Sequence, residues 1–251
     1  MDETEVVNLK FENAKNKVIG MERLRKSIGV LKEKTVHVIL KNYYEPCEDY
    51  HEIPVEGLVA DIYNNGEIIE IQTAHFDKLR DKLGRFLPYY DVTVVYPVAA
   101  NKWLVYIDKD TGEIISKRKS PVHGTEYDIF PELYKIKSYL NNEHIHFKVV
   151  LMDVEEYKTV NYKTNVKRGR RKSSKYDRVP LRLLEEVAIE RVEDYVQFLP
   201  IELPENFTSK DMANCSGIHV SVAQVVLNIL TYTGTVERIG KKGRSILYRV
   251  K

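Results

Sequence analysis

The sequence has little of what several classes of protein depend on. Its 251 residues contain two cysteines, Cys47 and Cys215, without CxxC or Cys/His spacing, which excludes a disulfide scaffold and a zinc cluster and indicates a reducing compartment. It has no run of 18 apolar residues, so nothing predicts a membrane span. Residues 1–8 are acidic and lack the basic and apolar regions of a signal peptide. We therefore expect a cytoplasmic protein without a membrane partner.

Net charge is also nearly absent, because 39 Lys and Arg stand against 37 Asp and Glu, a formal charge of +2. The distribution is uneven. Residues 161–180 carry eight basic residues against Asp177, a charge of +7, which leaves −5 on the rest of the chain. This stretch has almost no aliphatic content, which is typical of a linker. We predict a body over 1–158, a basic linker over 159–180 and a C-terminal module over 181–251.

The body begins with apolar residues at helical spacing over 18–44, which predict one broken helix or two short ones. Two β-rich runs then flank Asn65-Gly66, the strongest short hairpin signal. A helical pattern over 76–87 and a strand over 92–97 follow. A strand, a helix and a second strand predict a βαβ unit, in which the two strands lie parallel.

Further along the body, the runs 103–108 and 113–119 predict a second hairpin. Residues 131–141 predict a helix, and alternating apolar residues over 147–151 predict a strand. These elements indicate an α/β fold class, in which helices flank a mixed sheet.

The first hairpin carries two carboxylates whose register can be calculated. If Asn65 and Gly66 are the two loop residues of a type I′ turn, paired positions sum to 131 and Asp61 lies opposite Glu70. Gln72 shares the Glu70 face, because side chains at i and i+2 of a strand point the same way. The alternative is a slipped register, in which these residues are solvated positions on an exposed hairpin.

Opposed carboxylates repel unless a cation lies between them. Oxygen ligands at this spacing suit Mg²⁺ or Mn²⁺, so we predict a metal site formed by Asp61 and Glu70, with the Ile71 backbone carbonyl as a third protein ligand.

The run 56–61, followed nine residues later by Glu70-Ile-Gln72, resembles the core of the PD-(D/E)xK nuclease superfamily, which has the restriction-endonuclease-like fold. The resemblance covers about residues 20–155 and includes the order of helix, hairpin, helix and strand. It implies that Asp61 is similar to the first metal-binding aspartate of the family and Glu70 to its second acidic residue. Glu33 resembles the glutamate that many members supply from the first core helix.

Gln72 stands where the family usually has lysine. Glutamine keeps two N–H donors but no charge, and two interpretations follow. Lys78 or Lys82, on the next helix, could supply the charge, or the chain could be a member that does not cleave. In the active case, a divalent ion would acidify a bound water and stabilise charge on the phosphate. Gln72 would orient the attacking water, and Glu33 would position a second ion or a water.

In the C-terminal module, residues 181–199 predict a helix. After them, Thr208 or Ser209 is a suitable N-cap for a short helix, Ser216-Gly217 predicts a turn, and a longer helix starts near Val220. A strand, a basic Gly-rich turn and a strand complete residues 235–250. This order resembles a winged helix-turn-helix domain.

The second resemblance implies that the longer helix enters the major groove of DNA and that the wing contacts phosphates. The basic linker could add salt-dependent phosphate contacts, or it could be a solvated tether. The predicted DNA-binding residues are Ser221, Gln224 and Asn228 on the helix, Lys241, Lys242 and Arg244 on the wing, and Lys167, Arg168, Arg170, Arg171 and Lys172 in the linker.

We therefore expect a metal-dependent endonuclease that hydrolyses DNA, with double-stranded DNA as partner and Mg²⁺ or Mn²⁺ as cofactor. The alternatives are a catalytically inactive DNA-binding or regulatory protein with a nuclease fold, and a protein-interaction scaffold in which neither module meets nucleic acid. For the winged helix alone, the alternative is that it packs on the body or on a second subunit. A homodimer that cuts both strands is left open.

Overall fold

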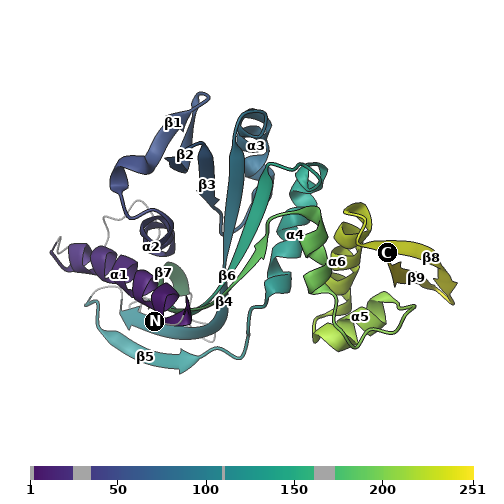
Figure 1. Cartoon of the computed structure of the whole chain (residues 1–251). Coiled ribbons are helices and arrows are strands. Elements are labelled where there is room, and N and C mark those ends of the chain that lie inside the picture. The colour runs from purple at the N-terminus through teal and green to yellow at the C-terminus, as the bar shows by residue number, and fades with distance from the viewer. Residues whose placement is uncertain (1–2, 25–34, 109–110, 161–172) are drawn as a thin grey trace. The chain divides into compact units, whose positions relative to one another are not determined.

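The structure is a computed structural model that describes residues 3–24, 35–108, 111–160 and 173–251 (Figure 1). In these residues a seven-stranded sheet has the order β1-β2-β3-β4-β6-β7, and β5 pairs with β4. The strands are β1 (His51–Val55), β2 (Leu58–Asn64), β3 (Glu67–Ile71), β4 (Asp91–Asp108), β5 (Ile114–Lys119), β6 (Ile145–Val160) and β7 (Ser173–Ile189). Antiparallel and parallel pairs both occur, and helices flank the sheet, so the predicted α/β class with a mixed sheet is confirmed.

The chain divides into two compact units. The first unit consists of Met1–His51, Pro97–Thr125 and Val150–Glu185. The second unit consists of Glu52–Tyr96, Glu126–Val149 and Glu186–Lys251. Strands β4 and β6 each contribute residues to both units.

The first hairpin has the predicted register. Asn65 and Gly66 both have positive φ, 50° and 89°, as a type I′ turn requires. The β2–β3 pairs include Ile62–Ile69 and Asn64–Glu67, so paired positions sum to 131. A two-residue turn of this type fixes the register of the flanking strands. The register could therefore be predicted from the local sequence alone.

The βαβ unit is also present. Strand β3 pairs parallel with β4 from Glu67–Asp91 to Ile71–Val95. The connection between them is a 3₁₀ turn η2 (Phe76–Leu79) followed by helix α3 (Arg80–Phe86). Strand β4 continues through Pro97, where a strand end was expected, because the β3 ladder stops two residues earlier and needs no N–H from proline there.

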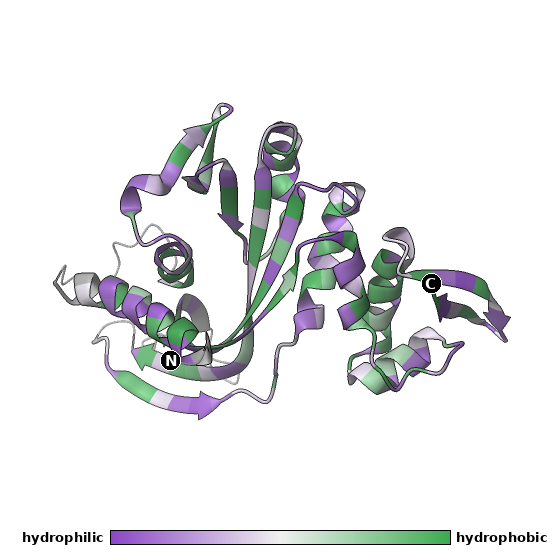
Figure 2. Cartoon of the chain, in the orientation of Figure 1, coloured by the Kyte–Doolittle hydropathy of each residue, from purple (hydrophilic) through white to green (hydrophobic). Residues whose placement is uncertain are grey.

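Short helices cover the core of the second unit. They are η3 (Glu126–Ile129), α4 (Phe130–Leu133) and η4 (Tyr134–Tyr139), so the helix predicted over 131–141 is interrupted and mostly of 3₁₀ type. The Glu132 carboxylate accepts the Phe76 N–H at 2.9 Å and holds η2 against this helical segment. Figure 2 shows apolar residues along α3 and α4. Phe130 and Leu133 of α4, and Phe76, Leu83 and Phe86 of η2 and α3, are almost fully buried.

Two helices lie in the first unit, α1 (Glu3–Leu24) and α2 (Thr35–Tyr44). They pack through an edge-to-face contact of Phe11 and Tyr43, whose ring centroids are 5.8 Å apart. Helix α2 agrees with the second half of the helical pattern predicted over 18–44. Helix α1 begins earlier than expected, at Glu3, and residues 25–34 of the predicted pattern lie outside the described residues.

The helix predicted over residues 181–199 is wrong. Strand β7 extends to Ile189 and is followed by a 3₁₀ helix, η5 (Val192–Phe198). Leu184 and Val196, which gave the helical spacing, are 38% and 52% exposed, whereas Leu183 is buried. Pairing with β6 decides the conformation of this segment, and a long-range partner leaves no local signature.

The C-terminal elements match their prediction more closely. Helices α5 (Ser209–Ser216) and α6 (Val220–Tyr232) are bent by 110° relative to each other, and β8 (Val236–Lys242) pairs with β9 (Ser245–Val250). Thr208 caps α5 and exchanges hydrogen bonds with Asp211, and Gly217 ends it with φ 66°. Among the described residues, no single helix has the length and apolarity to cross a membrane, and only the bent α5–α6 pair passes that test together.

Candidate functional site

Asp61 lies on β2 and turns its side chain toward β3. Its Oδ2 accepts the backbone N–H of Ile71 at 2.8 Å. The register of the hairpin puts Asp61 and Glu70 one position beyond the Ile62–Ile69 pair. The predicted neighbourhood of the two carboxylates is therefore present, and Asp61 is half-buried within it.

Glu70 is deeply buried because it shares a face of β3 with Ile68. Only 2% of Glu70 is exposed, and Ile68 is fully buried. Lys82, on α3, places its Nζ 2.9 Å from Oε1 and 2.7 Å from Oε2 of this carboxylate. The lysine side chain is 26% exposed, so it reaches Glu70 from the solvent side of the helix.

The environment raises the pKa of Glu70 to about 7. Burial is the largest cause, since a carboxylate loses its hydration there, and the negative charge of Asp61 adds to it. Lys82 acts in the opposite direction, both as a charge and as a hydrogen-bond donor. Glu70 thus exchanges a proton near neutral pH, which is typical of a carboxylate at a functional site.

Gln72 is engaged with its own loop. Its Nε2 donates to the backbone carbonyls of Ala74 and His75, the second at 3.4 Å. Both N–H donors of the amide face these carbonyls, so Gln72 is not turned toward Glu70 in the way a water-orienting residue would be. The positive charge beside Glu70 comes from Lys82.

Asp61 and Glu70 are the residues that would hold a divalent ion, if one binds here. Among the described residues, no group of three or more His, Cys, Asp or Glu side chains is arranged to hold a metal. Mg²⁺ needs no such group, because it keeps several waters and binds through one or two carboxylates. Asp61 and Glu70 are two such carboxylates, and Lys82 Nζ contacts both oxygens of Glu70. The Ile71 carbonyl lies on the same strand edge as its N–H, which faces Asp61.

Several predicted residues lie outside the described part of the chain. Glu33 is one of them. The basic residues Lys167, Arg168, Arg170, Arg171 and Lys172 are the others. The strands on either side of that basic segment, β6 and β7, are neighbours in one sheet.

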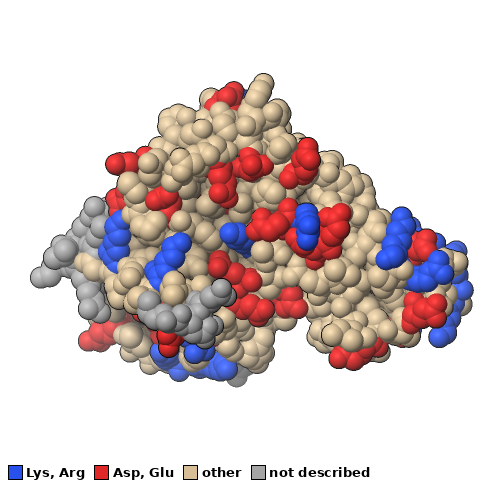
Figure 3. Space-filling view, viewed as in Figure 1, with Lys and Arg blue, Asp and Glu red and all other residues tan. Residues whose placement is uncertain are grey.

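The predicted DNA-binding residues of α6 and the wing differ in exposure. Ser221 and Gln224 are exposed on α6, and Figure 3 shows Lys and Arg side chains gathered over β8 and β9. The exposed wing residues are Lys241, Lys242 and Arg244. Asn228 was expected on the same open face but is half-buried, and its Oδ1 accepts from Lys137 Nζ at 2.7 Å. This correction follows from the packing of α6 on α4 and η4.

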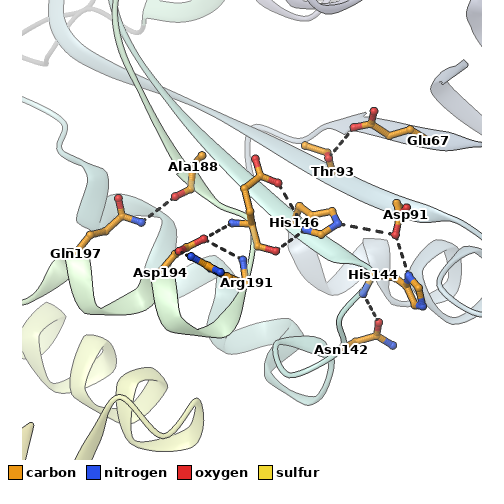
Figure 4. Close-up of polar contacts among 11 residues, drawn as sticks. Glu67, Asp91, Thr93, Asn142, His144, His146, Ala188, Arg191, Asp194 and Gln197 are labelled. Atoms are coloured by element: carbon orange, nitrogen blue, oxygen red, sulfur yellow. Dashed lines mark hydrogen bonds and ion pairs between the residues drawn. The ribbon is translucent and has the colours of Figure 1, made fainter. Parts of the chain in front are cut away.

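A polar cluster that the sequence did not reveal joins the ends of three strands (Figure 4). Asp91 Oδ1 lies 2.8 Å from His144 Nδ1 and 3.9 Å from His146 Nε2. His146 Nδ1 contacts the Glu190 carbonyl at 2.7 Å. The spacing His-x-His was visible at 144–146, but its partners lie about fifty residues away in each direction. The cluster ties the starts of β4 and β6 to the end of β7.

The fold and the site together define an α/β protein with a mixed sheet, in which a buried carboxylate, a facing aspartate and a helical lysine meet beside a parallel strand pair. The chain belongs to the family described as a domain of unknown function (DUF8091), whose model matches residues 34–190. It is similar to an uncharacterized protein of Treponema pallidum (strain Nichols), with 31% identity over 228 residues that cover 89% of this chain and 87% of the relative. No solved structure matches the chain.

Proposed function

We propose that this protein is a metal-dependent endonuclease of the restriction-endonuclease-like fold, which hydrolyses DNA and holds the duplex with a C-terminal winged helix. The observation that carries the proposal is the arrangement of Asp61, Glu70 and Lys82. It supplies two acidic ligands and one positive charge, which together are what the family motif requires.

The order of elements supports the fold assignment. A helix, α2, precedes the hairpin that carries Asp61 and Glu70, and α3 and the parallel strand β4 follow it. This is the order that the resemblance implies. The α5–α6 pair and the β8–β9 hairpin likewise support a winged helix, with the exposed basic residues at the tip of the hairpin.

Each residue of the site has a role in the proposed reaction. Asp61 and Glu70 would hold the divalent ion, which supplies Lewis acidity and an acidified water when it is bound. Glu70 would release its proton as it becomes a ligand, because its pKa lies near 7. Lys82 would provide a positive charge near the scissile phosphate, where a lysine on β3 is replaced by Gln72.

A cleavage assay with matched lysine variants tests this proposal. Asp61→Ala removes an acidic ligand, and we expect no cleavage of duplex DNA with Mg²⁺ or Mn²⁺. Lys82→Met should lower the single-turnover rate by about a hundredfold or more, the usual effect of removing a charged stabiliser. The control is Lys78→Met, which removes an exposed lysine from the preceding turn and should leave the rate unchanged.

Circular dichroism at the assay pH establishes that each variant is folded. Cleavage that survives in Asp61→Ala, or equal rates for the two lysine variants, would contradict the proposed site.

The second candidate is a DNA-binding protein with this fold that does not cleave. One observation favours it. Lys82 already pairs with Glu70, so the repulsion between Asp61 and Glu70 is reduced without a metal. A chain that no longer cleaves DNA could therefore keep both carboxylates. The assay separates the two candidates. Wild-type protein that binds duplex DNA and cuts none of a range of substrates would be the non-cleaving form.

A further inference from the structure

Glu156, on β6 in the first unit, is a buried carboxylate with four cations around it. Its side chain is 2% exposed. The cation nitrogens of four residues on three neighbouring strands lie within 4.0 Å of its oxygens. They are Arg178 at 3.1 Å, Lys158 at 3.2 Å, Lys175 at 3.9 Å and Lys102 at 4.0 Å.

The cluster carries more positive charge than is required to neutralise the Glu156 carboxylate. Burial alone would raise the pKa of Glu156, but Arg178 and the three lysines outweigh that effect and lower it, so the carboxylate is ionised. Among the described residues, four positive charges then face one negative charge, an excess of three. Cations held this close repel one another, and an anion that reached them would relieve the repulsion.

The positive side of the cluster is the side that solvent reaches. Lys175 is 68% exposed and Arg178 36%, whereas their common carboxylate is inaccessible. Two further pairs in this unit, Lys117–Glu155 and Arg182–Asp153, have the same polarity, since each has an exposed cation and a mostly buried carboxylate. In the described part of this unit, each of those pairs has one cation and one carboxylate, whereas Glu156 has a surplus of cations.

The width of the cluster indicates the kind of anion. Its cations come from β4, β6 and β7, which are adjacent in the sheet. Three neighbouring strands span about 10 Å, which is wider than a single phosphate group but fits consecutive phosphates of a polynucleotide. A buried carboxylate that fixes several cations also reduces the side-chain entropy cost of binding.

We propose that the Glu156 cluster is a phosphate-binding surface for the backbone of duplex DNA, separate from the wing. The proposal rests on the proposed function for the identity of the polyanion. Glu156 is a positioning residue, and Lys175, Lys158, Lys102 and Arg178 contact the phosphates.

The test measures DNA binding by the full chain in EDTA, so that cleavage and metal binding do not contribute. Fluorescence anisotropy gives Kd for a labelled duplex at several salt concentrations between about 50 and 200 mM. Removal of one phosphate-binding cation should reduce the slope of log K against log salt by about 0.9. Lys175→Ala should therefore reduce the slope by about one, and the Lys158→Ala/Lys175→Ala double variant by about two.

The control is Lys17→Ala, which removes a cation of the same unit that pairs with Glu48 and lies outside the Glu156 cluster, and it should leave the slope unchanged. Wild-type slope in the double variant, with wild-type binding intact, would overturn this inference and leave the proposed function in place. No binding of duplex DNA by the wild type would overturn both. Variants whose affinity falls for single-stranded RNA but not for duplex DNA would overturn the identity of the partner.

Discussion

The buried position of Glu70 removes water from its carboxylate, which destabilises the charged form. Glu70 lies beside Ile68 on a buried face, with Asp61 nearby, and Lys82 offsets part of the cost. A chain that needed only a stable sheet would have an apolar residue at this position, since exchange of a buried ion pair for well-packed apolar residues is often neutral or stabilising. Its position argues for a chemical role, which the proposed nuclease site would provide.

The raised pKa of Glu70 predicts how stability depends on pH. The folded protein keeps a proton on Glu70 up to about pH 7, whereas the unfolded chain releases it near 4.5. The free energy of unfolding should therefore fall as pH rises through this window, by at most about 1.4 kcal/mol per pH unit, and stay low above it. Glu70→Gln should remove this fall, so its advantage over wild type should grow between about pH 5 and pH 8.

Urea unfolding without divalent ions measures this difference. Glu67→Gln, an exposed carboxylate on the same strand, is the control for the removal of one negative charge. A constant difference between Glu70→Gln and wild type across this range would contradict the raised pKa.

At the scale of elements, some conformations are determined by local sequence and others by a distant strand partner. The β2–β3 register could be predicted because two residues, Asn65 and Gly66, determine it. The strand β7 could not, because its apolar residues allow a helix as readily until β6 is present. Lys82 is an intermediate case: its place on the next helix was visible, but only the packing of α3 on β3 shows that it reaches Glu70.

Two glycines predict opposite effects of the same substitution. Gly66 has φ 89°, which alanine adopts only with strain, so Gly66→Ala should lower the free energy of unfolding by about 1 kcal/mol. Gly20 lies in α1 with nothing within 4 Å of an added Cβ, so Gly20→Ala should raise it by about 0.5–1 kcal/mol. Urea unfolding of both variants checks the signs.

Gly66→Ala should also slow cleavage, because it loosens the hairpin that aligns Asp61 with Glu70.

At the scale of the whole molecule, several ion pairs have a mostly buried carboxylate and a more exposed cation. The near-zero net charge is an average over buried carboxylates, such as Glu70 and Glu156, and exposed cations on the wing and around Glu156. The sequence showed the uneven distribution of charge along the chain. It could not show that the carboxylate is buried and the cation more exposed in pairs such as Lys82–Glu70 and Arg178–Glu156, because depth depends on the sheet as a whole.

The connection between β6 and β7 gives the basic segment a different role from that of an interdomain tether. A single cut between Val160 and Ser173 leaves two fragments that both contribute strands to the same sheet. We expect the fragments to stay together after limited trypsin treatment and to elute as one species in gel filtration, with separation only in denaturant. Release of a free C-terminal fragment in native buffer would contradict this. The chain is thus a natural candidate for a split protein, whose halves could be produced separately and restored by strand pairing.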